Sequence, residues 1–259
     1  GRSFWDKRNK ENFDSAEANY KHAIDLDPDY ALAYSGLADL YIYNQKGLTQ
    51  MEAIPIARDY VNKALTLDST LSEALTTLGF IQSAFDYNWA DAKKTLEKAI
   101  QLNTNYPTAH LFYGNLLQYT GENTDEGISE IKKALSLDPL SSNLNYVLGR
   151  NFYYARKYDS AYEQLKKTIA LYPNNELAKG NLVYVLLALK KYPEAIEAIN
   201  QLDSNNTSPI RYYPYTIRSY AYGITGNPTL AKLSLKKSME DVPDQSGFFL
   251  GQAYAILYN

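Results

Sequence analysis

The sequence predicts an all-α protein, a solenoid of about seven antiparallel helix pairs that ends in a lone helix. Three observations support this fold class: a sequence phrase that recurs at a fixed period, apolar and small residues spaced three and four apart within each copy, and turn-forming residues between the copies. The 259 residues are 45% hydrophobic, which is enough for a sizeable core.

The recurring phrase is a small residue, an apolar residue four positions later, a second small residue three further, and then a leucine. Its fullest form ends in Leu26-Asp27-Pro28 and again in Leu137-Asp138-Pro139. The later copies close at Thr104, Pro139 and Pro173, which are 35 and 34 residues apart. Spacings of three and four place these residues on one face of a helix, called here the B helix.

A second phrase lies between the copies of the first. It is an apolar residue, a small residue directly after it, and a large residue three further, as in Leu37-Ala38-Tyr41 and Leu148-Gly149-Phe152. This phrase predicts an A helix that precedes each B helix. The predicted repeats are about 1–28, 29–69, 70–104, 105–139, 140–173, 174–207 and 208–243, followed by a terminal helix at 247–258.

Helix-breaking residues lie where the helix pairs need turns. Gly121 and Gly226-Asn227-Pro228 fall between A and B helices, and Pro107 stands in the first turn of an A helix, where no N–H is required. The small residues of both phrases let the paired backbones approach closely, so a bulky replacement there should cost roughly 1–3 kcal/mol.

A period of 34 with small residues on both helices and Leu-Asp-Pro at the junction resembles the tetratricopeptide repeat family. Residues 140–173 fit the family pattern without a gap, whereas the sixth repeat departs from it, with Val183 at a usually small position, and irregular packing is expected near 200–212. The resemblance implies a right-handed superhelix whose concave wall is made of A helices and binds a protein segment.

A finer similarity, together with the ends of the chain, indicates a larger parent protein. Gly1–Arg8, Leu26–Asp39 and Phe152–Asp159 are similar to repeat regions of multidomain bacterial regulators, where such regions follow winged-helix, nucleotide cyclase or kinase domains. In repeat register Gly1 falls inside an A helix, and Gly247–Tyr258 forms an A helix without its B helix. We therefore expect a fragment of a larger signalling or transcription-regulating protein.

Composition limits the possible functions. The formal net charge is −3, there is no cysteine, and there are two histidines, so neither direct nucleic-acid binding nor a metal or other cofactor is indicated. No apolar stretch approaches the roughly 20 residues that span a bilayer, so membrane insertion is not expected. The sequence does not determine the cellular compartment. A cytoplasmic location is favoured, and a periplasmic location is expected if the parent protein carries an upstream transmembrane helix.

Catalytic motifs are absent from the sequence, and a non-enzymatic protein is expected. His22 and His110 are interpreted as packing or solvent-facing residues, and the acidic segment Glu122–Glu126 as a solvated turn rather than a phosphate or calcium loop. About seven extra residues within Asn44–Pro55 are expected to lengthen one turn, either as a tolerated loop or as a contact site.

The residues of the concave wall follow from the register of the A helices. Side chains two, five, nine and twelve positions into each A helix share a face that does not pack on the B helix. The predicted peptide-binding groove consists of Asp39, Tyr43, Thr76, Phe80, Asn115, Tyr119, Tyr146, Arg150, Tyr153, Asn181, Tyr184, Thr216 and Tyr220. Amides hold a peptide backbone, tyrosine rings give flat contact, and Arg150 can bind a carboxylate with two hydrogen bonds.

Three hypotheses follow from this wall. The first is an interaction module that binds a protein or peptide segment in the groove; the second is an oligomerisation scaffold that stacks on another copy through end helices near Phe4-Trp5 and Phe248-Phe249. The third is a small-molecule sensor that uses the tyrosines. Alternatively, individual tyrosines fill the interfaces between repeats. A chaperone-tail clamp is not indicated, because Leu111 stands where that clamp needs lysine.

Overall fold

The computed structural model describes residues 10–44, 48–203 and 213–241, and every regular element in these ranges is an α-helix. The helices are α2 (Lys10–Leu26), α3 (Ala31–Asn44), α4 (Gln50–Leu67), α5 (Ser72–Ala84), α6 (Trp89–Leu102), α7 (Pro107–Thr120), α8 (Thr124–Leu137), α9 (Ser142–Tyr154), α10 (Tyr158–Leu171), α11 (Glu176–Ala188), α12 (Tyr192–Asp203), α13 (Tyr213–Ile224) and α14 (Pro228–Asp241). The predicted all-α class is confirmed for this part of the chain, in which no helix is long and apolar enough to cross a membrane.

Some expectations lie outside the described residues. These are the start of the first A helix and its Phe4-Trp5 pair, most of the irregular packing near 200–212, and the terminal helix at 247–258 with Phe248-Phe249.

The chain forms two compact units. Unit 1 is Gly1–Asp138 and contains α2 to α8; unit 2 is Pro139–Asn259 and contains α9 to α14. In both units the odd-numbered helices are the A helices and the even-numbered helices are the B helices. Each unit is described by itself below.

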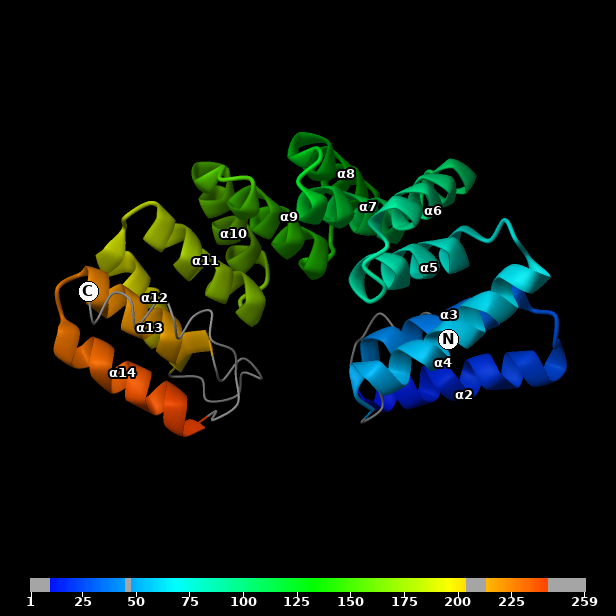
Figure 1. Cartoon of the computed structure of the whole chain (residues 1–259), viewed down its shortest axis with the longest axis horizontal. Coiled ribbons are helices and arrows are strands. Elements are labelled where there is room, and N and C mark those ends of the chain that lie inside the picture. Colours follow the sequence, from blue (N-terminus) through cyan, green and yellow to red (C-terminus); the bar gives the residue numbers. More distant parts are fainter. Residues whose placement is uncertain (1–9, 45–47, 204–212, 242–259) are drawn as a thin grey trace. The chain divides into compact units, whose positions relative to one another are not determined.

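In unit 1 each A helix packs on the B helix that follows it. The pairs are α3 with α4, α5 with α6 and α7 with α8, and consecutive A helices also touch, α3 with α5 and α5 with α7. Consecutive helices accordingly lie side by side in chain order (Figure 1). The face of each A helix that does not pack on its B helix can therefore join the same face of the next A helix in one surface.

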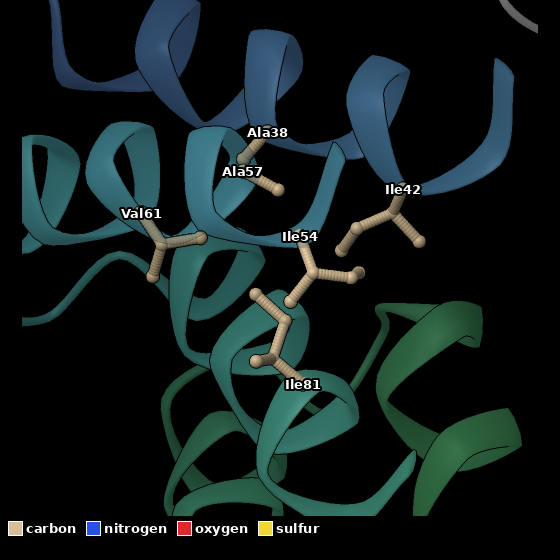
Figure 2. Packing of buried hydrophobic residues seen from close by; sticks show 6 residues of the cluster. All are labelled: Ala38, Ile42, Ile54, Ala57, Val61 and Ile81. Atoms are coloured by element: carbon tan, nitrogen blue, oxygen red, sulfur yellow. The ribbon is translucent and has the colours of Figure 1, made fainter. Parts of the chain in front are cut away.

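The core of unit 1 shows why the sequence phrases alternate small and large residues. Ala38 of α3 meets Ala57 of α4, and Ile54, Val61 and Ile81 fill the space around the crossing (Figure 2). Ala38, Ala57, Val61 and Ile81 are fully buried. Burying a branched aliphatic side chain stabilises the fold by about 1.5–3 kcal/mol.

Two glycines bring α7 and α8 into direct backbone contact. A Cβ atom added to Gly114 would lie 2.6 Å from the carbonyl oxygen of Gly127, and one added to Gly127 would lie 2.8 Å from the carbonyl oxygen of Gly114. The prediction that small residues on both helices permit close approach is confirmed here, because no larger side chain fits without separating the helices.

In unit 2 the same pairing recurs: α9 with α10, α11 with α12 and α13 with α14. Consecutive A helices touch again, α9 with α11 and α11 with α13. At the first crossing, a Cβ atom on Gly149 would lie 2.7 Å from Cδ2 of Leu165, which is fully buried. The fifth repeat thus packs its B-helix leucine directly onto the A-helix glycine.

The insertion in the second repeat is not only a longer turn, which corrects the sequence expectation. Helix α4 has 18 residues, whereas α6, α8 and α10 have 14 each, so part of the insertion extends the B helix at its N-terminus. The extension is stabilised by a capping box in which the Thr49 hydroxyl accepts from the Glu52 N–H and the Glu52 carboxylate accepts from the Thr49 N–H at 2.8 Å. The Thr49 N–H, together with the Thr49 hydroxyl that donates to the same carboxylate at 2.9 Å, lowers the pKa of Glu52.

Candidate functional site

The predicted groove residues belong to six A helices, three in each unit. Asp39, Tyr43, Thr76, Phe80, Asn115 and Tyr119 lie on α3, α5 and α7 of unit 1, and the remaining seven lie on α9, α11 and α13 of unit 2. Because the fold positions each set on successive, touching A helices, each set can form a continuous surface within its own unit.

The unit 1 set contains a row of stacked aromatic rings. The Phe80 ring lies 4.6 Å from the Phe112 ring and 6.3 Å from the Tyr43 ring, both nearly parallel, and Phe85 meets its edge at 5.8 Å. Phe112 is buried and was not among the residues predicted for the groove. It could have been predicted as a neighbour of Phe80, because it is an aromatic residue of the next A helix. The row ties α3, α5 and α7 together and leaves Tyr43 38% exposed.

The polar members of the unit 1 set are used within the fold. The Thr77 hydroxyl of α5 donates to Oδ1 of Asp39 on α3 at 2.5 Å. Thr76 is 1% exposed and its hydroxyl donates to the Ser72 carbonyl at 2.8 Å. Thr76 therefore does not line an open surface, which corrects its assignment to the wall: the neighbouring helices cover position five of α5.

Two members of the unit 1 set keep solvent access on α7. Tyr119 is 62% exposed and Asn115 is partly exposed. The exposed side chains of the unit 1 set are thus scattered over this face and do not form a single cluster.

Unit 2 concentrates its predicted residues around Arg150 of α9. The guanidinium carbon of Arg150 lies 5.6 Å from the centre of the Tyr146 ring and 6.0 Å from the centre of the Tyr154 ring. Tyr146, Arg150 and Tyr154 are spaced four residues apart, so they follow one face of the helix. Each cation–π contact of this kind is worth about 0.5–1 kcal/mol when exposed and more when desolvated, and the pair fixes the direction of the Arg150 side chain.

Helix α11 completes this surface. The Tyr184 ring lies 6.2 Å from the Tyr153 ring, and Tyr153 also contacts Tyr154 at 5.7 Å and Tyr158 at 5.8 Å. The Asn181 amide donates to the Tyr146 hydroxyl at 3.4 Å. We call Tyr146, Arg150, Tyr153, Tyr154, Asn181 and Tyr184 the tyrosine cluster.

The hydroxyl of Tyr153 stays protonated over the physiological pH range. Burial raises the pKa of Tyr153, and the nearby Tyr158, Tyr154 and Tyr220 hydroxyls raise it further. Tyr220 of α13 is the last of the contributors to this upward shift of the Tyr153 pKa. The Thr216 side chain lies outside the described residues, although its backbone belongs to α13.

Tyr146 has a supporting rather than a contacting position. Its side chain is only 6% exposed, with the ring next to Arg150 and the hydroxyl accepting from Asn181. This corrects its assignment as a groove-lining side chain. Arg150, Tyr153, Asn181, Tyr184 and Tyr220 are all partly exposed, and Tyr154 is 51% exposed.

His110 has a structural role, as the sequence predicted. It is 4% exposed, with Nδ1 at 2.5 Å from Oε2 of Glu130 and Nε2 at 3.0 Å from the Thr104 carbonyl. The hydrogen bond to Glu130 raises the pKa of His110, against the opposing effects of burial and of nearby Lys133. Protonated His110 donates to both oxygens and so links α7 to α8 and to the preceding turn. His22 is solvent-exposed, also as predicted.

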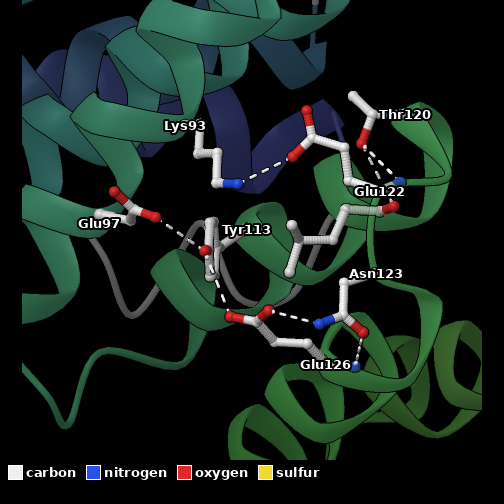
Figure 3. A network of polar contacts seen from close by, with 8 residues as sticks. Lys93, Glu97, Tyr113, Thr120, Glu122, Asn123 and Glu126 are labelled. Carbon is white, nitrogen blue, oxygen red and sulfur yellow. Dashed lines mark hydrogen bonds and ion pairs between the residues drawn. The ribbon is translucent and has the colours of Figure 1, made fainter.

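The acidic turn before α8 is occupied by protein contacts (Figure 3). The Glu122 carboxylate pairs with Nζ of Lys93 at 2.8 Å, and the Tyr113 hydroxyl donates to Glu97 at 2.9 Å, with a Glu126 oxygen at 3.4 Å. Burial and these carboxylates raise the pKa of Tyr113. Asn123 caps α8, and no group of metal-ligating residues occurs in the described ranges.

The paired helices and the residues at their crossings define a repeat protein. The tetratricopeptide repeat models match residues 7–30 and 152–213. The chain contains tetratricopeptide repeats, and its helices match those of solved proteins of that fold. One such structure is the anaphase-promoting complex assembly Cut9–Hcn1, with a TM-score of 0.73 at 19% identity over 95% of this chain and 45% of that one.

Other solved structures support the same fold. A tetratricopeptide repeat protein from Parabacteroides merdae has a TM-score of 0.65 at 16% identity, covering 100% of this chain and 97% of that chain. YrrB, described as a TPR protein with an unusual peptide-binding site, has a TM-score of 0.51 at 19% identity, covering 71% and 93%.

Two curated relatives are similar in sequence. Human protein O-mannosyl-transferase TMTC3 is 25% identical over 82% of this chain and 22% of its own length. Anaphase-promoting complex subunit 3 of Schizosaccharomyces pombe is 26% identical over 55% of this chain and 21% of its own length. The chain therefore matches about a fifth of the length of these relatives.

Proposed function

We propose that the chain is a non-enzymatic interaction module and that the tyrosine cluster of unit 2 binds an extended segment of a partner protein. The observation that carries the proposal is the position of Arg150 between the Tyr146 and Tyr154 rings, next to partly exposed Tyr153 and Tyr184. A cation whose direction is already fixed loses little entropy when it binds a carboxylate.

The cluster offers three kinds of contact to a peptide. Arg150 supplies charge for a carboxylate, Asn181 supplies an amide, and the tyrosine rings supply flat apolar surface with polar edges. The tetratricopeptide fold supports a protein-binding role, and the peptide-binding site named for YrrB belongs to a chain of the same fold.

Peptide panning tests this proposal while the natural partner is still unidentified. A random dodecapeptide library displayed on phage is selected on the purified chain, and an enriched peptide is measured by fluorescence anisotropy. Arg150→Ala should weaken binding by about 1–3 kcal/mol, because it leaves a carboxylate without its partner. The chain should stay folded, with its stability lowered by about 1–2 kcal/mol through the loss of the two cation–π contacts. Tyr30→Ala, which removes a 44%-exposed tyrosine in unit 1, is the matched control.

Two results would contradict the proposal. One is the absence of any enriched peptide that binds the chain in solution. The other is equal affinity for the parent chain and for Arg150→Ala combined with Tyr184→Ala.

We also propose that the chain is the regulatory or sensing part of a larger bacterial signalling or transcription-regulating protein. The support is the similarity of Gly1–Arg8, Leu26–Asp39 and Phe152–Asp159 to the repeat regions of such regulators. Sequencing the complete gene tests this: an adjoining winged-helix, cyclase or kinase domain is expected, and an open reading frame with no output domain would contradict it.

A further inference from the structure

Two successive turns of unit 2 carry pairs of basic residues. Arg156-Lys157 joins α9 to α10, and Lys190-Lys191 joins α11 to α12. Arg156, Lys157 and Lys190 are exposed and Lys191 is partly exposed. We call these four residues the basic turn edge.

The two turns have the same backbone hydrogen bonds. The N–H groups of Arg156 and Lys157 donate to carbonyls three and five residues earlier, both at 2.9 Å. Those of Lys190 and Lys191 do the same at 3.0 and 2.8 Å. This pattern is a Schellman motif, in which the residue after the helix adopts a left-handed conformation and is usually glycine. The four basic residues thus occupy equivalent places one repeat apart.

Arg156 and Lys190 are the left-handed residues of these turns, with φ of 58° and 60°. The corresponding left-handed residue after α7 is Gly121 and after α13 is Gly226. A residue with a Cβ atom is strained in this conformation by about 1–2 kcal/mol, which glycine avoids. Strained residues that replace glycine in a turn point to a role for their side chains.

The groups around the turns leave Arg156 and Lys190 available. Nζ of Lys191 lies 4.3 Å from the Tyr162 ring centre and 4.0 Å from Oε1 of Glu194. Asp159 and Glu163 lie on α10 near the first turn, and Lys166 approaches the same ring at 5.9 Å. Within the described residues, neither Arg156 nor Lys190 has an ion-pair partner.

We propose that the basic turn edge is a second interaction surface, separate from the tyrosine cluster, that binds an extended acidic segment of a partner protein. Its cations lie in two separate turns, and the carboxylates of Asp159, Glu163 and Glu194 flank these turns on α10 and α12. Such an arrangement favours a ligand with separate carboxylates, because a nucleic-acid backbone or an anionic membrane presents continuous negative charge that would also meet these flanking carboxylates.

The repeat spacing sets the spacing of those carboxylates. Helices α9 and α11 touch, and packed helices lie about 8–10 Å apart. An extended chain advances about 3.3 Å per residue. Acidic residues about three positions apart therefore reach both turns at once.

The test uses a fluorescein-labelled dodecapeptide with glutamate at every third position among glycine and serine, measured by anisotropy on the whole chain at low salt. Arg156→Gly combined with Lys190→Gly should weaken binding about fivefold or more, because two exposed ion contacts are lost. The melting temperature should stay unchanged or rise, since glycine fits both turns without strain. Binding should also fall as salt screens the charges.

Two control variants accompany the test. Tyr87→Gly relieves the same left-handed conformation in unit 1, where φ is 54°, without changing charge, and should bind like the parent. Lys94→Gln combined with Lys98→Gln removes two exposed cations elsewhere and should weaken binding less than twofold. Arg150→Ala should leave binding of this peptide intact, which separates the edge from the tyrosine cluster.

Four results would overturn the proposal. The first is equal binding of a peptide with glutamine in place of glutamate, and the second is full affinity in the glycine double variant. The third is an equal loss in the Lys94/Lys98 control. The fourth is tighter binding of a single-stranded RNA oligonucleotide or of phosphatidylserine vesicles than of the glutamate peptide, which would assign the edge to another class of partner.

Discussion

Gly114→Ala isolates the energetic role of the backbone contact between α7 and α8. The added Cβ atom would lie 2.6 Å from the Gly127 carbonyl oxygen and 2.8 Å from Cγ1 of Ile131. A carbon–oxygen contact normally needs about 3.3–3.6 Å, so the two helices must separate by roughly 0.7–1 Å. A gap of that size costs the neighbouring atoms a quarter to a half of their dispersion energy.

The magnitude follows from two opposing effects. Overpacking against a backbone atom that cannot rotate away costs about 2–3 kcal/mol, the upper part of the usual range. Alanine in place of glycine in a helix returns about 1 kcal/mol. We therefore expect Gly114→Ala to lower the free energy of unfolding by about 1–2 kcal/mol.

Gly180→Ala is the matched control. Gly180 also lies inside an A helix, but no atom lies within 4 Å of an added Cβ. The substitution should therefore raise the free energy of unfolding by about 1 kcal/mol. Subtracting the change in the free energy of unfolding of Gly180→Ala from that of Gly114→Ala removes the effect of helix propensity and leaves the effect of the steric clash.

The assay is urea unfolding followed by far-ultraviolet circular dichroism. Because the chain has two compact units, each transition is fitted separately, and hydrogen exchange of the α7 and α8 amides assigns the change to unit 1. A Gly114→Ala protein that is as stable as the parent, with Gly180→Ala behaving as expected, would refute the close approach of α7 and α8.

Three further predictions concern single contacts. Because the pKa of His110 is raised in the fold, its contribution to stability is fully present below the unfolded value near 6.5 and is lost as pH rises through the folded pKa. The difference in stability between the parent and His110→Gln, measured by urea unfolding, should therefore narrow as pH rises above about 6.5, and a difference that widens would contradict this. A double-mutant cycle of Tyr162→Leu and Lys191→Gln should give a coupling energy of about 0.5–1 kcal/mol in thermal unfolding, and zero coupling would remove the cation–π contact. Arg156→Gly should stabilise the chain by up to about 1 kcal/mol whereas Gly121→Ala should destabilise it by about 1 kcal/mol, and calorimetric shifts of the same sign would contradict the left-handed assignment.

The sequence predicts the helix pairs because the repeated spacing of small and large residues corresponds directly to the helix crossings. Gly114 and Gly149 each accept a close neighbour from the following B helix, as their places in the repeated phrases indicate. The crossing of an A helix with its B helix depends only on the two helix faces that meet there, and both helices belong to the same repeat. Local periodicity is therefore sufficient to predict it.

The exposure of the wall residues was harder to predict. Register gives the angle of a side chain around its helix, but whether that side chain is open depends on the size and conformation of side chains in the next repeat. Thr76 and Tyr146 both occupy position five, and both are buried. Arg150 and Tyr184, at position nine, remain partly exposed.

The helical insertion could have been predicted from a local motif. Thr49-x-x-Glu52 before an apolar run is a capping box, and Ile54 and Val61 continue the B-helix spacing on either side of Ala57. The basic turn edge likewise has a sequence signal, since Arg156 and Lys190 align with the turn glycines Gly121 and Gly226.

One contact between repeats differs between the two units and involves Lys191 of the basic turn edge. In unit 1 the residue after the small B-helix alanine forms an ion pair with the turn of the next repeat: Arg58 with Asp86 at 2.6 Å, and Lys93 with Glu122 at 2.8 Å. In unit 2 the equivalent B-helix residue is Tyr162, and the turn residue that meets it is Lys191.

Both units thus keep a contact between the B helix and the turn of the next repeat, but the turn residue is acidic in unit 1 and basic in unit 2. An acidic turn neutralised by a basic B helix leaves no excess charge. In unit 2 the B helix α10 offers Lys191 a neutral ring instead, and the carboxylate beside Lys191, that of Glu194 at 4.0 Å, belongs to the following helix α12. Tyr162→Lys combined with Lys191→Glu should restore the ion pair of unit 1, preserve stability within about 1 kcal/mol, and weaken binding of the glutamate peptide. If the exchanged pair still bound that peptide with parental affinity, the charge of the turn would not be what the acidic ligand recognises.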